Sequence, residues 1–431
     1  MSETRSNSTV ESAVAETKER FVNRHPGSLA AHVEAAAVMP GGNTRTTLFY
    51  APFPVVMARG EGCRLTDVDG HEYVDFLGEY TAGLYGHNHP VIRAAIDGAL
   101  DAGWNLGAHG VQEARLARLV CDRFPSLDLV RFTNSGTEAN LMAIATALVV
   151  TGRKRVMVFR GGYHGGVMYF GGPKGAAPAP VNAPHEWVMG TYNDEAATGP
   201  LIDDSIAAIL VEPMQGSGGC IAANPTFLAM LRAGATRVGA VLVFDEVMTS
   251  RMSAGGLQAR LGITPDMTTL GKYIGGGMSF GAFGGRLDIM ERYDPRRPDV
   301  LPHAGTFNNN VLTMAAGVAG LRDLFTPAAA EALFARGEAL RAELDAIAPG
   351  MRWTGVGSLM NVHFQQDAPR SPAELRDRPD LRELFFLDML ERGFYMAKRG
   401  MVALSLEIGD AECAAFVDAV REFAAVRGRL F

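Results

Sequence analysis

The sequence is poor in cysteine, in long apolar runs and in excess positive charge. Only four cysteines occur in 431 residues, far apart and without a Cys-x-x-Cys pair, which argues against a disulfide framework or a zinc knuckle. The apolar run from Leu141 to Val150 is far shorter than the roughly 20 residues of a membrane span. A formal net charge of −7 argues against a nucleic-acid-binding surface. We therefore expect a soluble protein with neither nucleic acid nor membrane as a partner.

The first 20 residues have neither the apolar core of a secretion signal nor the composition of a transit peptide, because they contain several acidic residues. This composition predicts a cytoplasmic protein. With 47% hydrophobic residues, the chain is long enough to bury the cores of one large and one smaller domain.

Residues 240–285 contain two ionisable groups that each follow a short apolar run. The run Ala240 to Phe244, too short for a helix and rich in Val, precedes Asp245. A second run, Met267 to Leu270, ends in glycine and Lys272. In open α/β sheets, ligands bind outside the carboxyl ends of the strands. We therefore expect this carboxylate and this amine to face one site.

A carboxylate and a lysine in such a site have a specific use in cofactor chemistry. Pyridoxal phosphate needs a lysine that forms a Schiff base with its aldehyde and an acid opposite its pyridine nitrogen. Lys272 would supply the amine and Asp245 the acid. Taken singly, both residue types are common on protein surfaces, so the assignment depends on the surrounding sequence.

The surrounding sequence resembles a known family. DEVMTSR at 245–251 and TTLGKYIGGGMSFGAFGGR at 268–286 resemble the two signatures of class III pyridoxal phosphate-dependent aminotransferases, and the resemblance extends over nearly the whole chain. Met248, where many ornithine-type members carry glutamine, resembles the branch that contains glutamate-1-semialdehyde aminomutase and the β-amino acid aminotransferases. GGNTRTTLFYAPFP at 41–54 and EYTAGLYGH at 79–87 are most similar to the β-amino acid (β-phenylalanine) aminotransferases.

The resemblance implies the fold. We expect a fold type I pyridoxal phosphate-dependent transferase, an α/β protein with a mostly parallel central sheet in a large domain and a smaller α+β domain. Residues 1–60 would form the N-terminal segment of the small domain, 61–320 the large cofactor-binding domain and 321–431 the rest of the small domain. The family also implies a homodimer with shared active sites, in which a small-molecule amino donor and a keto acid react.

A phosphate site is predicted between a strand at 130–133 and a helix at 139–150. Ser135 with Glu138 three residues later fits a capping box, and a glycine at a helix amino end lets backbone N–H groups approach an anion. Such a strand–turn–helix unit is ordinary by itself. In the family, the residues matching Ser135, Gly136 and Thr137 hold the cofactor phosphate.

Other cofactor residues are implied by the resemblance alone. Tyr163 would cover one face of the pyridine ring and Val247 would press on the other. Glu212, after a predicted strand at 206–211, matches a cofactor-site position. Thr306 matches a threonine that reaches the phosphate of the neighbouring subunit.

Two arginines are candidates for binding carboxylates, because a guanidinium group can make bidentate contacts with them. Arg45 matches the family arginine that binds the substrate carboxylate, and Arg399 matches a second one in the β-amino acid enzymes. Glu79 and Tyr80 lie where the family lines its substrate pocket. Ser217 stands where ornithine-type members carry a gating glutamate, so their switch between substrates is not expected.

These features predict an aminotransferase that moves the amino group of an aromatic or aliphatic β-amino acid to a 2-keto acid such as 2-oxoglutarate or pyruvate. A glutamate-1-semialdehyde 2,1-aminomutase-like enzyme or a general ω-transaminase remains the alternative. The sequence HGG at 164–166, where the aminomutase carries HGH, and the presence of Arg399 favour transfer between molecules. A nicotinamide dehydrogenase would need GxGxxG after its first strand and an acid about 20 residues later, which we do not find in that context.

Several smaller expectations complete the interpretation. The Gly-, Ala- and Pro-rich segment 171–184 is predicted to be a loop near the site and a candidate lid. His87 and His89 lack a third ligand at suitable spacing, so no metal site is expected there. Helices are expected at 11–39 with a break near Pro26, and at 328–347, 381–392 and 410–426.

Overall fold

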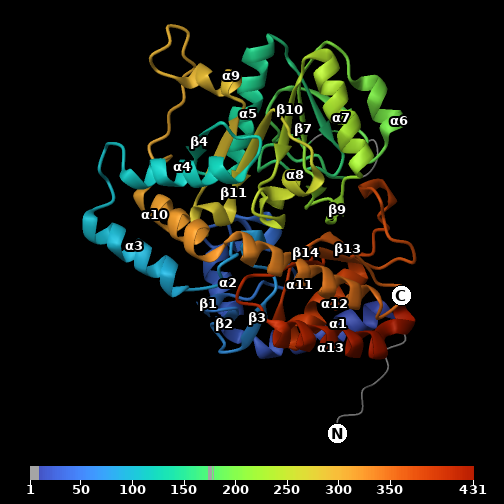
Figure 1. The fold of residues 1–431 in the computed structure, drawn as a ribbon. Coiled ribbons are helices and arrows are strands. Elements are labelled where there is room, and N and C mark those ends of the chain that lie inside the picture. The colour runs from blue at the N-terminus through green and yellow to red at the C-terminus, as the bar shows by residue number, and fades with distance from the viewer. Residues whose placement is uncertain (1–8, 173–176, 178) are drawn as a thin grey trace.

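Two layered bodies make up the chain, and one of them combines both ends of the sequence (Figure 1). The structure, a computed structural model, describes residues 9–172, 177 and 179–431. The upper body in Figure 1 holds a large sheet between helices, whereas the lower body brings the first helices of the chain against the last ones. From residue 9 onward the chain therefore runs from the lower body into the upper one and returns.

The central sheet has seven strands in the order β4-β12-β11-β10-β7-β5-β6. Only β12 among these strands runs against its neighbours, β11 and β4. This order confirms the predicted α/β fold with a mostly parallel sheet. The strands are β4 (Leu129–Thr133), β5 (Arg155–Phe159), β6 (Glu186–Gly190), β7 (Ile206–Val211), β10 (Val241–Asp245), β11 (Met267–Gly271) and β12 (Gly281–Gly285).

Helices cover both faces of this sheet, which explains the continuous apolar runs in its strands. Successive side chains of a strand point to opposite faces. Val243 packs in the cluster that contains α5 (Gly136–Thr151), and Phe244 packs in the cluster that contains α7 (Pro225–Val238). Both side chains are fully buried, so the end of β10 is fixed from two sides.

The lower body contains two smaller sheets, β1-β2-β3-β15 and β13-β14-β16. In the first of them, β3 pairs in parallel with β15, which joins residues near 75 to residues near 395. The helix expected at 11–39 is present as two helices that meet at Pro26, and α1 packs on α12. The elements are α1 (Val10–Arg24), α2 (Pro26–Ala36), β1 (Met57–Glu61), β2 (Arg64–Asp67), β3 (Glu72–Asp75), α11 (Pro327–Asp345), β13 (Arg352–Val356), β14 (Leu359–His363), α12 (Pro379–Glu391), β15 (Phe394–Tyr395), β16 (Met401–Ala403) and α13 (Asp410–Arg427).

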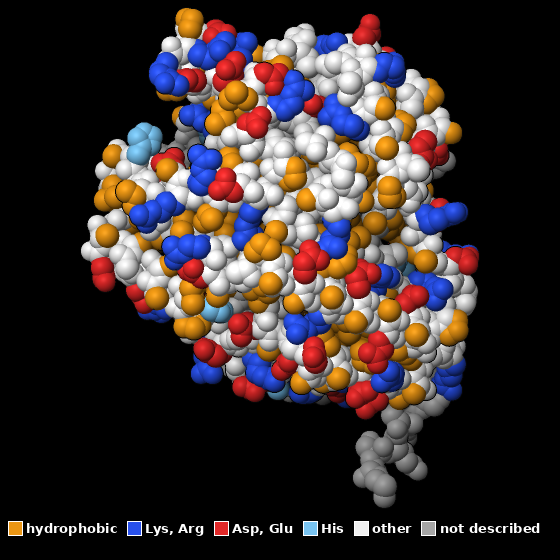
Figure 2. All heavy atoms as spheres, viewed as in Figure 1, with side chains coloured by type: hydrophobic (Ala, Val, Ile, Leu, Met, Phe, Trp, Pro, Cys, Tyr) orange, Lys and Arg blue, Asp and Glu red, His pale blue; other side chains and the backbone are white. Residues whose placement is uncertain are grey.

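The remaining elements connect or flank these two bodies, and α10 packs against α3 and α4. They are α3 (Pro90–Ala102), α4 (Val111–Arg123), α6 (Glu195–Thr198), β8 (Met214–Gln215), β9 (Ile221–Ala222), α8 (Gly256–Leu261), α9 (Leu287–Met290) and α10 (Val311–Ala319). On the face shown in Figure 2, positive and negative side chains are interspersed. Within the described residues, no helix combines the length and the apolar character that crossing a membrane would require.

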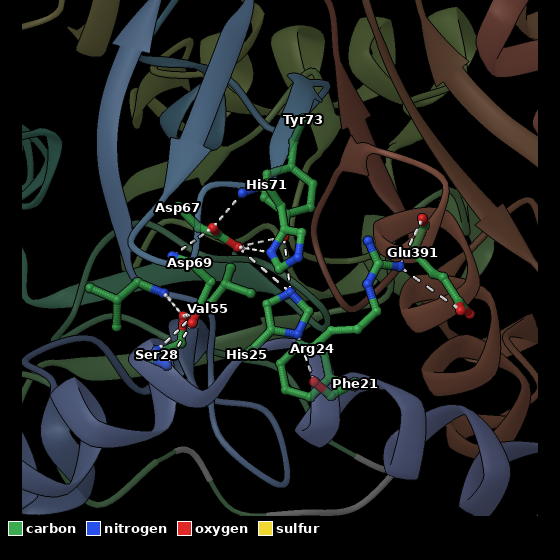
Figure 3. A network of polar contacts seen from close by, with 12 residues as sticks. Phe21, Arg24, His25, Ser28, Val55, Asp67, Asp69, His71, Tyr73 and Glu391 are labelled. Atoms are coloured by element: carbon green, nitrogen blue, oxygen red, sulfur yellow. Dashed lines mark hydrogen bonds and ion pairs between the residues drawn. The ribbon is translucent and has the colours of Figure 1, made fainter.

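A buried polar network fastens the junction of α1 and α2 to the β2–β3 hairpin (Figure 3). His25 Nδ1 lies 2.7 Å from the carbonyl oxygen of Phe21, and its Nε2 lies 3.0 Å from the hydroxyl of Tyr73. Tyr73 donates to Asp67 Oδ2 at 2.7 Å, and His71 Nδ1 lies 3.0 Å from the same oxygen. Burial acts to raise the pKa of Asp67, but the hydrogen bonds from Tyr73 and His71 outweigh it and hold that pKa below its ordinary value.

Replacing Asp67 with Asn should lower the free energy of unfolding by about 1–3 kcal/mol at pH 7, because an amide cannot accept all the hydrogen bonds that the carboxylate accepts. The folded pKa of Asp67 is depressed, so its stabilisation is complete above the ordinary value of 3.8 and is lost as the pH falls through the lower folded value. Denaturant titrations of the parent and the variant at several pH values measure this difference. The exposed Asp97→Asn provides the control, and equal effects of the two substitutions would contradict the role of the network.

Candidate active site

Asp245 and Lys272 emerge from neighbouring parallel strands at the same edge of the central sheet. Asp245 is the last residue of β10, and Lys272 follows β11 directly. In the register of these strands, Asp245 is paired with Thr269, three residues before the lysine. The structure thus brings the two residues together at the carboxyl edge, where an α/β sheet binds its ligands.

The Asp245 side chain is only 4% exposed and is held on both oxygens. Its Oδ2 accepts a hydrogen bond from Asn140 Nδ2 at 2.8 Å and lies 2.7 Å from His164 Nδ1, while Oδ1 accepts from the Val247 N–H at 3.0 Å. Burial acts to lower the pKa of His164, but the hydrogen bond and charge of Asp245 outweigh it and raise the pKa overall. The carboxylate is therefore fixed in place opposite a histidine that favours its protonated form.

Asn140 and His164 are site residues that the sequence analysis did not single out. Asn140 lies on α5 and also accepts a hydrogen bond from the Thr269 hydroxyl at 2.7 Å, so it connects β10 and β11. His164 follows Tyr163 directly, and this adjacency to a ring expected at the cofactor is the signal that points to it. Glu246, by contrast, turns away from Asp245, because its carboxylate accepts from backbone N–H groups at the start of α8.

Lys272 has an unusual backbone and a basicity suited to reaction. Its φ is +59°, a left-handed conformation that non-glycine residues adopt at a cost and that is concentrated at functional sites. The side chain is partly buried, and its Nζ donates a hydrogen bond to the carbonyl oxygen of Tyr80. Burial, with a further contribution from Arg399, lowers the pKa of Lys272 to about 8. More of this amine is therefore neutral near neutral pH than for an exposed lysine.

The amino end of α5 lies where the sequence predicts an anion-binding turn. Ser135 is the N-cap and accepts a hydrogen bond from the Glu138 N–H at 3.2 Å. The expected capping box is wrong in its second half, because the Glu138 carboxylate accepts from the Asn134 N–H instead of that of Ser135. A side chain at Gly136 would lie 2.9 Å from Val247, so the glycine lets Val247 pack against the helix end. The first N–H groups of such a helix have no partner within it and point outward.

The Glu212 carboxylate is hydrogen-bonded to the backbone of Tyr163. Glu212 is 5% exposed, and its carboxylate accepts hydrogen bonds from the N–H groups of Tyr163 at 3.0 Å and Gly216 at 3.1 Å. Burial raises the pKa of Glu212 to about 7, an effect that the nearby His164 opposes. Tyr163 is 45% exposed, so part of its surface is accessible to a ligand.

Thr306 stays apart from these residues within the single chain. It is exposed in the segment before α10, and none of the hydrogen bonds or ion pairs found in the described parts of the chain involves it. Phe307 beside it is 58% exposed. The role expected of Thr306, contact with a neighbouring subunit, remains a prediction.

Arg45 and Arg399 lie 354 positions apart in the chain order but share one aromatic ring. The guanidinium carbon of Arg45 lies 5.1 Å from the centre of the Tyr80 ring and that of Arg399 lies 5.6 Å from it. Arg45 also forms an ion pair with Glu79. Because the Tyr80 carbonyl oxygen accepts from Lys272, both guanidinium groups belong to the surroundings of the amine.

Two further sequence expectations concern neighbouring segments. His87 Nε2 lies 2.9 Å from Asp75 Oδ2, whereas His89 Nδ1 accepts from the Val91 N–H at the start of α3. The two histidines therefore have separate structural partners. In the segment predicted as a loop and candidate lid, residues 173–176 and 178 lie outside the described residues, so the lid remains a prediction.

Comparisons with known proteins identify the family to which this chain is similar. The family described as aminotransferase class-III matches residues 49–171 and 182–423. A β-phenylalanine transaminase of Variovorax paradoxus is 52% identical over 429 residues, 98% of each chain. A glutamate-1-semialdehyde 2,1-aminomutase of Desulfosudis oleivorans is 38% identical over 394 residues, 86% of this chain and 91% of that one.

Solved structures give the same relationship. The crystal structure of a β-phenylalanine aminotransferase from Variovorax paradoxus has a TM-score of 0.95 at 52% identity and covers 98% of this chain and 99% of that one. An ω-transaminase from Sphaerobacter thermophilus has a TM-score of 0.87 at 37% identity and covers 94% and 100% of the two chains.

The residues at the sheet edge fit pyridoxal phosphate. They provide a fixed buried carboxylate, an amine whose pKa is lowered, a half-exposed aromatic ring and a helix amino end that favours a phosphate. The family match and the high identity over nearly the whole chain confirm the resemblance seen in the sequence. The chain therefore belongs to the class III aminotransferases and is a fold type I, pyridoxal phosphate-dependent transaminase.

Proposed function

We propose that this transaminase moves the amino group of a β-amino acid to a 2-keto acid such as 2-oxoglutarate or pyruvate. The observation that carries the proposal is the pair of guanidinium groups, Arg45 and Arg399, on the Tyr80 ring beside Lys272. A transaminase accepts two carboxylate-bearing substrates in turn, and bidentate guanidinium contacts suit both. The 52% identity to a protein named for β-phenylalanine supports the choice of a β-amino donor.

The cofactor would be held by residues from several elements. Pyridoxal phosphate, when bound, supplies an aldehyde carbon for the amino group and a ring that accepts electrons. In our proposal its phosphate lies at Ser135, Gly136 and Thr137, at the amino end of α5. Tyr163 and Val247 would contact the cofactor ring, and Glu212 holds the Tyr163 backbone in place through a hydrogen bond from its N–H.

Lys272 and Asp245 would carry the chemistry. Lys272 would be the residue that holds the cofactor covalently, and its amine, when free, would accept and return the proton of the substrate carbon. Burial lowers its pKa to about 8, which increases the share of the neutral amine needed to take that proton. Asp245 is held by Asn140 and His164, and its negative charge would favour a protonated ring nitrogen in the bound cofactor.

We also propose that the enzyme acts as a homodimer in the cytoplasm, with Thr306 reaching the cofactor phosphate of the partner. The exposure of Thr306 and Phe307 supports a contact with a second copy. Apolar side chains on the segment from Trp104 to Val111 are also exposed, and a partner surface would cover them. Four free cysteines are compatible with a reducing compartment.

Replacing Lys272 with Ala should abolish turnover and leave a folded protein, because no other group in the proposed site can both hold the cofactor and move the proton. A transaminase assay, circular dichroism and borohydride fixation of the cofactor measure activity, folding and attachment. Lys154→Ala, at an exposed position, is the matched control. Substantial transaminase activity in the Lys272 variant would disprove its assignment.

Replacing Asp245 with Asn should leave cofactor binding intact but slow the single-turnover rate by about 100-fold or more, because a stabilising charge is lost where charge develops. Stopped-flow absorbance of the cofactor-loaded variant measures that rate. Asp410→Asn, at an exposed helix start, controls for the loss of one carboxylate. A nearly unchanged rate would mean that another group keeps the ring nitrogen protonated.

The two arginines should separate the two half-reactions. Each charge-assisted contact contributes roughly 1.5–3 kcal/mol, so its loss slows its own half-reaction by about 10- to 150-fold. We expect Arg45→Ala to impair transfer from the β-amino acid and Arg399→Ala to impair transfer to the keto acid. Stopped-flow measurement of each half-reaction tests this division. Equal effects of both variants on both half-reactions would contradict it.

The parent enzyme provides a further test of the donor class. Relatives named as an aminomutase and an ω-transaminase, at 38% and 37% identity, favour these two activities as the alternatives. If α-amino acids or simple amines outcompete β-amino acids in the amino-donor half-reaction, a general ω-transaminase or aminomutase-like activity replaces our proposal.

A further inference from the structure

The turn that carries Glu79 and Tyr80 has an unusual backbone. Three consecutive non-glycine residues, Glu79, Tyr80 and Thr81, have φ values of 47°, 51° and 81°. Each left-handed residue of this kind costs energy, and such residues persist only where the surroundings enforce them. Here Asp75 Oδ1 accepts from the N–H groups before the turn, and the Tyr80 hydroxyl donates to the Thr47 carbonyl oxygen at 3.0 Å.

This turn presents a carboxylate to one of the two arginines. Glu79 Oε1 forms an ion pair with Arg45 Nη1. Arg399 differs, because in the described residues no carboxylate lies within ion-pair distance of it and its Nε is buried without a hydrogen-bond partner. Of the two guanidinium groups beside Tyr80, one is thus already neutralised by the protein and the other is not.

Glu79 can leave Arg45 at little cost. Its side chain is 59% exposed and that of Arg45 is 41% exposed, so water can solvate both groups once they separate. Ion pairs with this exposure are weak, and a bidentate carboxylate with good geometry can displace the single contact that Glu79 makes. The strained turn holds the Glu79 backbone in place during such an exchange, so the side chain can return.

We propose that Glu79 is an internal competitor that occupies Arg45 until the carboxylate of the amino donor displaces it. The inference rests on the proposed function for the identity of the donor, but not for the competition itself. Donors without a carboxylate leave the Arg45–Glu79 pair intact and gain no binding free energy from Arg45. Glu79 thereby lowers the affinity for every carboxylate that uses Arg45 and keeps the guanidinium group neutralised between turnovers.

The test compares two donors that differ only in a carboxylate-bearing substituent, 3-amino-3-phenylpropanoate and 1-phenylethylamine. Glu79→Gln keeps the size of the side chain and removes its charge. In single-turnover experiments, the apparent dissociation constant of the first donor, divided by that of the second, should fall by about two- to fivefold. Glu186→Gln, at an exposed position on β6, removes the same charge elsewhere and should leave this ratio unchanged. Glu79→Ala repeats the test should Gln disturb the turn.

A binding experiment removes the dependence on turnover. Calorimetric titration with 3-phenylpropanoate, a carboxylate without an amine, should show tighter binding by Glu79→Gln by the same factor. In an Arg45→Ala background, Glu79→Gln should have no effect, because its competitor role acts only through Arg45. An equal gain in that background, or no gain in the parent background, would overturn the inference.

The outcomes separate this inference from the proposed function. If the parent does not use β-amino acids but 3-phenylpropanoate binding still tightens through Arg45, the competitor role of Glu79 stands and the proposed donor is wrong. If the parent uses β-amino acids but the donor ratio and the calorimetric affinity do not change in the variant, the proposed function stands and the inference about Glu79 is wrong.

Discussion

The burial of one carboxylate, Asp245, is the constraint on which this site depends. A charge removed from water is tolerated only when hydrogen bonds replace those of the solvent. The chain supplies them from three directions, with Asn140 on α5, His164 after β5 and the Val247 N–H beyond β10. The sheet, its covering helix and the loop after the neighbouring strand must therefore all be in place before the carboxylate has its full set of partners.

The site also contains backbone conformations that the rest of the fold must enforce. Lys272 and the turn at 79–81 both adopt left-handed φ values. The Lys272 amine donates a hydrogen bond to the carbonyl oxygen of Tyr80. β11 is fully buried between two strands, and β3 is paired on both sides in its own sheet. Each strained segment thus follows a strand that is paired on both sides. The two strands restrict the backbone movement of Lys272 and of the turn at 79–81.

The sequence predicts most of the strands of the upper body because their apolar runs are short and end in polar or glycine residues. The runs at 206–211 and 240–244 correspond to β7 and β10 within one residue. The partners of Asp245 could not be predicted in this way, because Asn140 and His164 are distant in sequence and no periodicity marks them. The capping box predicted that Glu138 accepts from the Ser135 N–H, but in the structure its carboxylate accepts from the Asn134 N–H. The sequence pattern does not specify which of these two neighbouring N–H groups the side chain reaches. Arg45 and Arg399 were found only through resemblance, and the ring they share is a property of the fold.

The shared Tyr80 ring places the two proposed carboxylate-binding arginines close to each other. Two guanidinium groups beside Tyr80 repel each other, while each is attracted by the face of the aromatic ring. Glu79 neutralises Arg45, whereas in the described part of the chain no carboxylate pairs with Arg399. In our proposal, a donor carboxylate would replace Glu79 at Arg45 and preserve this balance, because one carboxylate substitutes for another. In the described residues no carboxylate forms an ion pair with Arg399, whose Nη2 contacts the sulfur of Met401, so the two proposed binding steps would differ in what the substrate displaces.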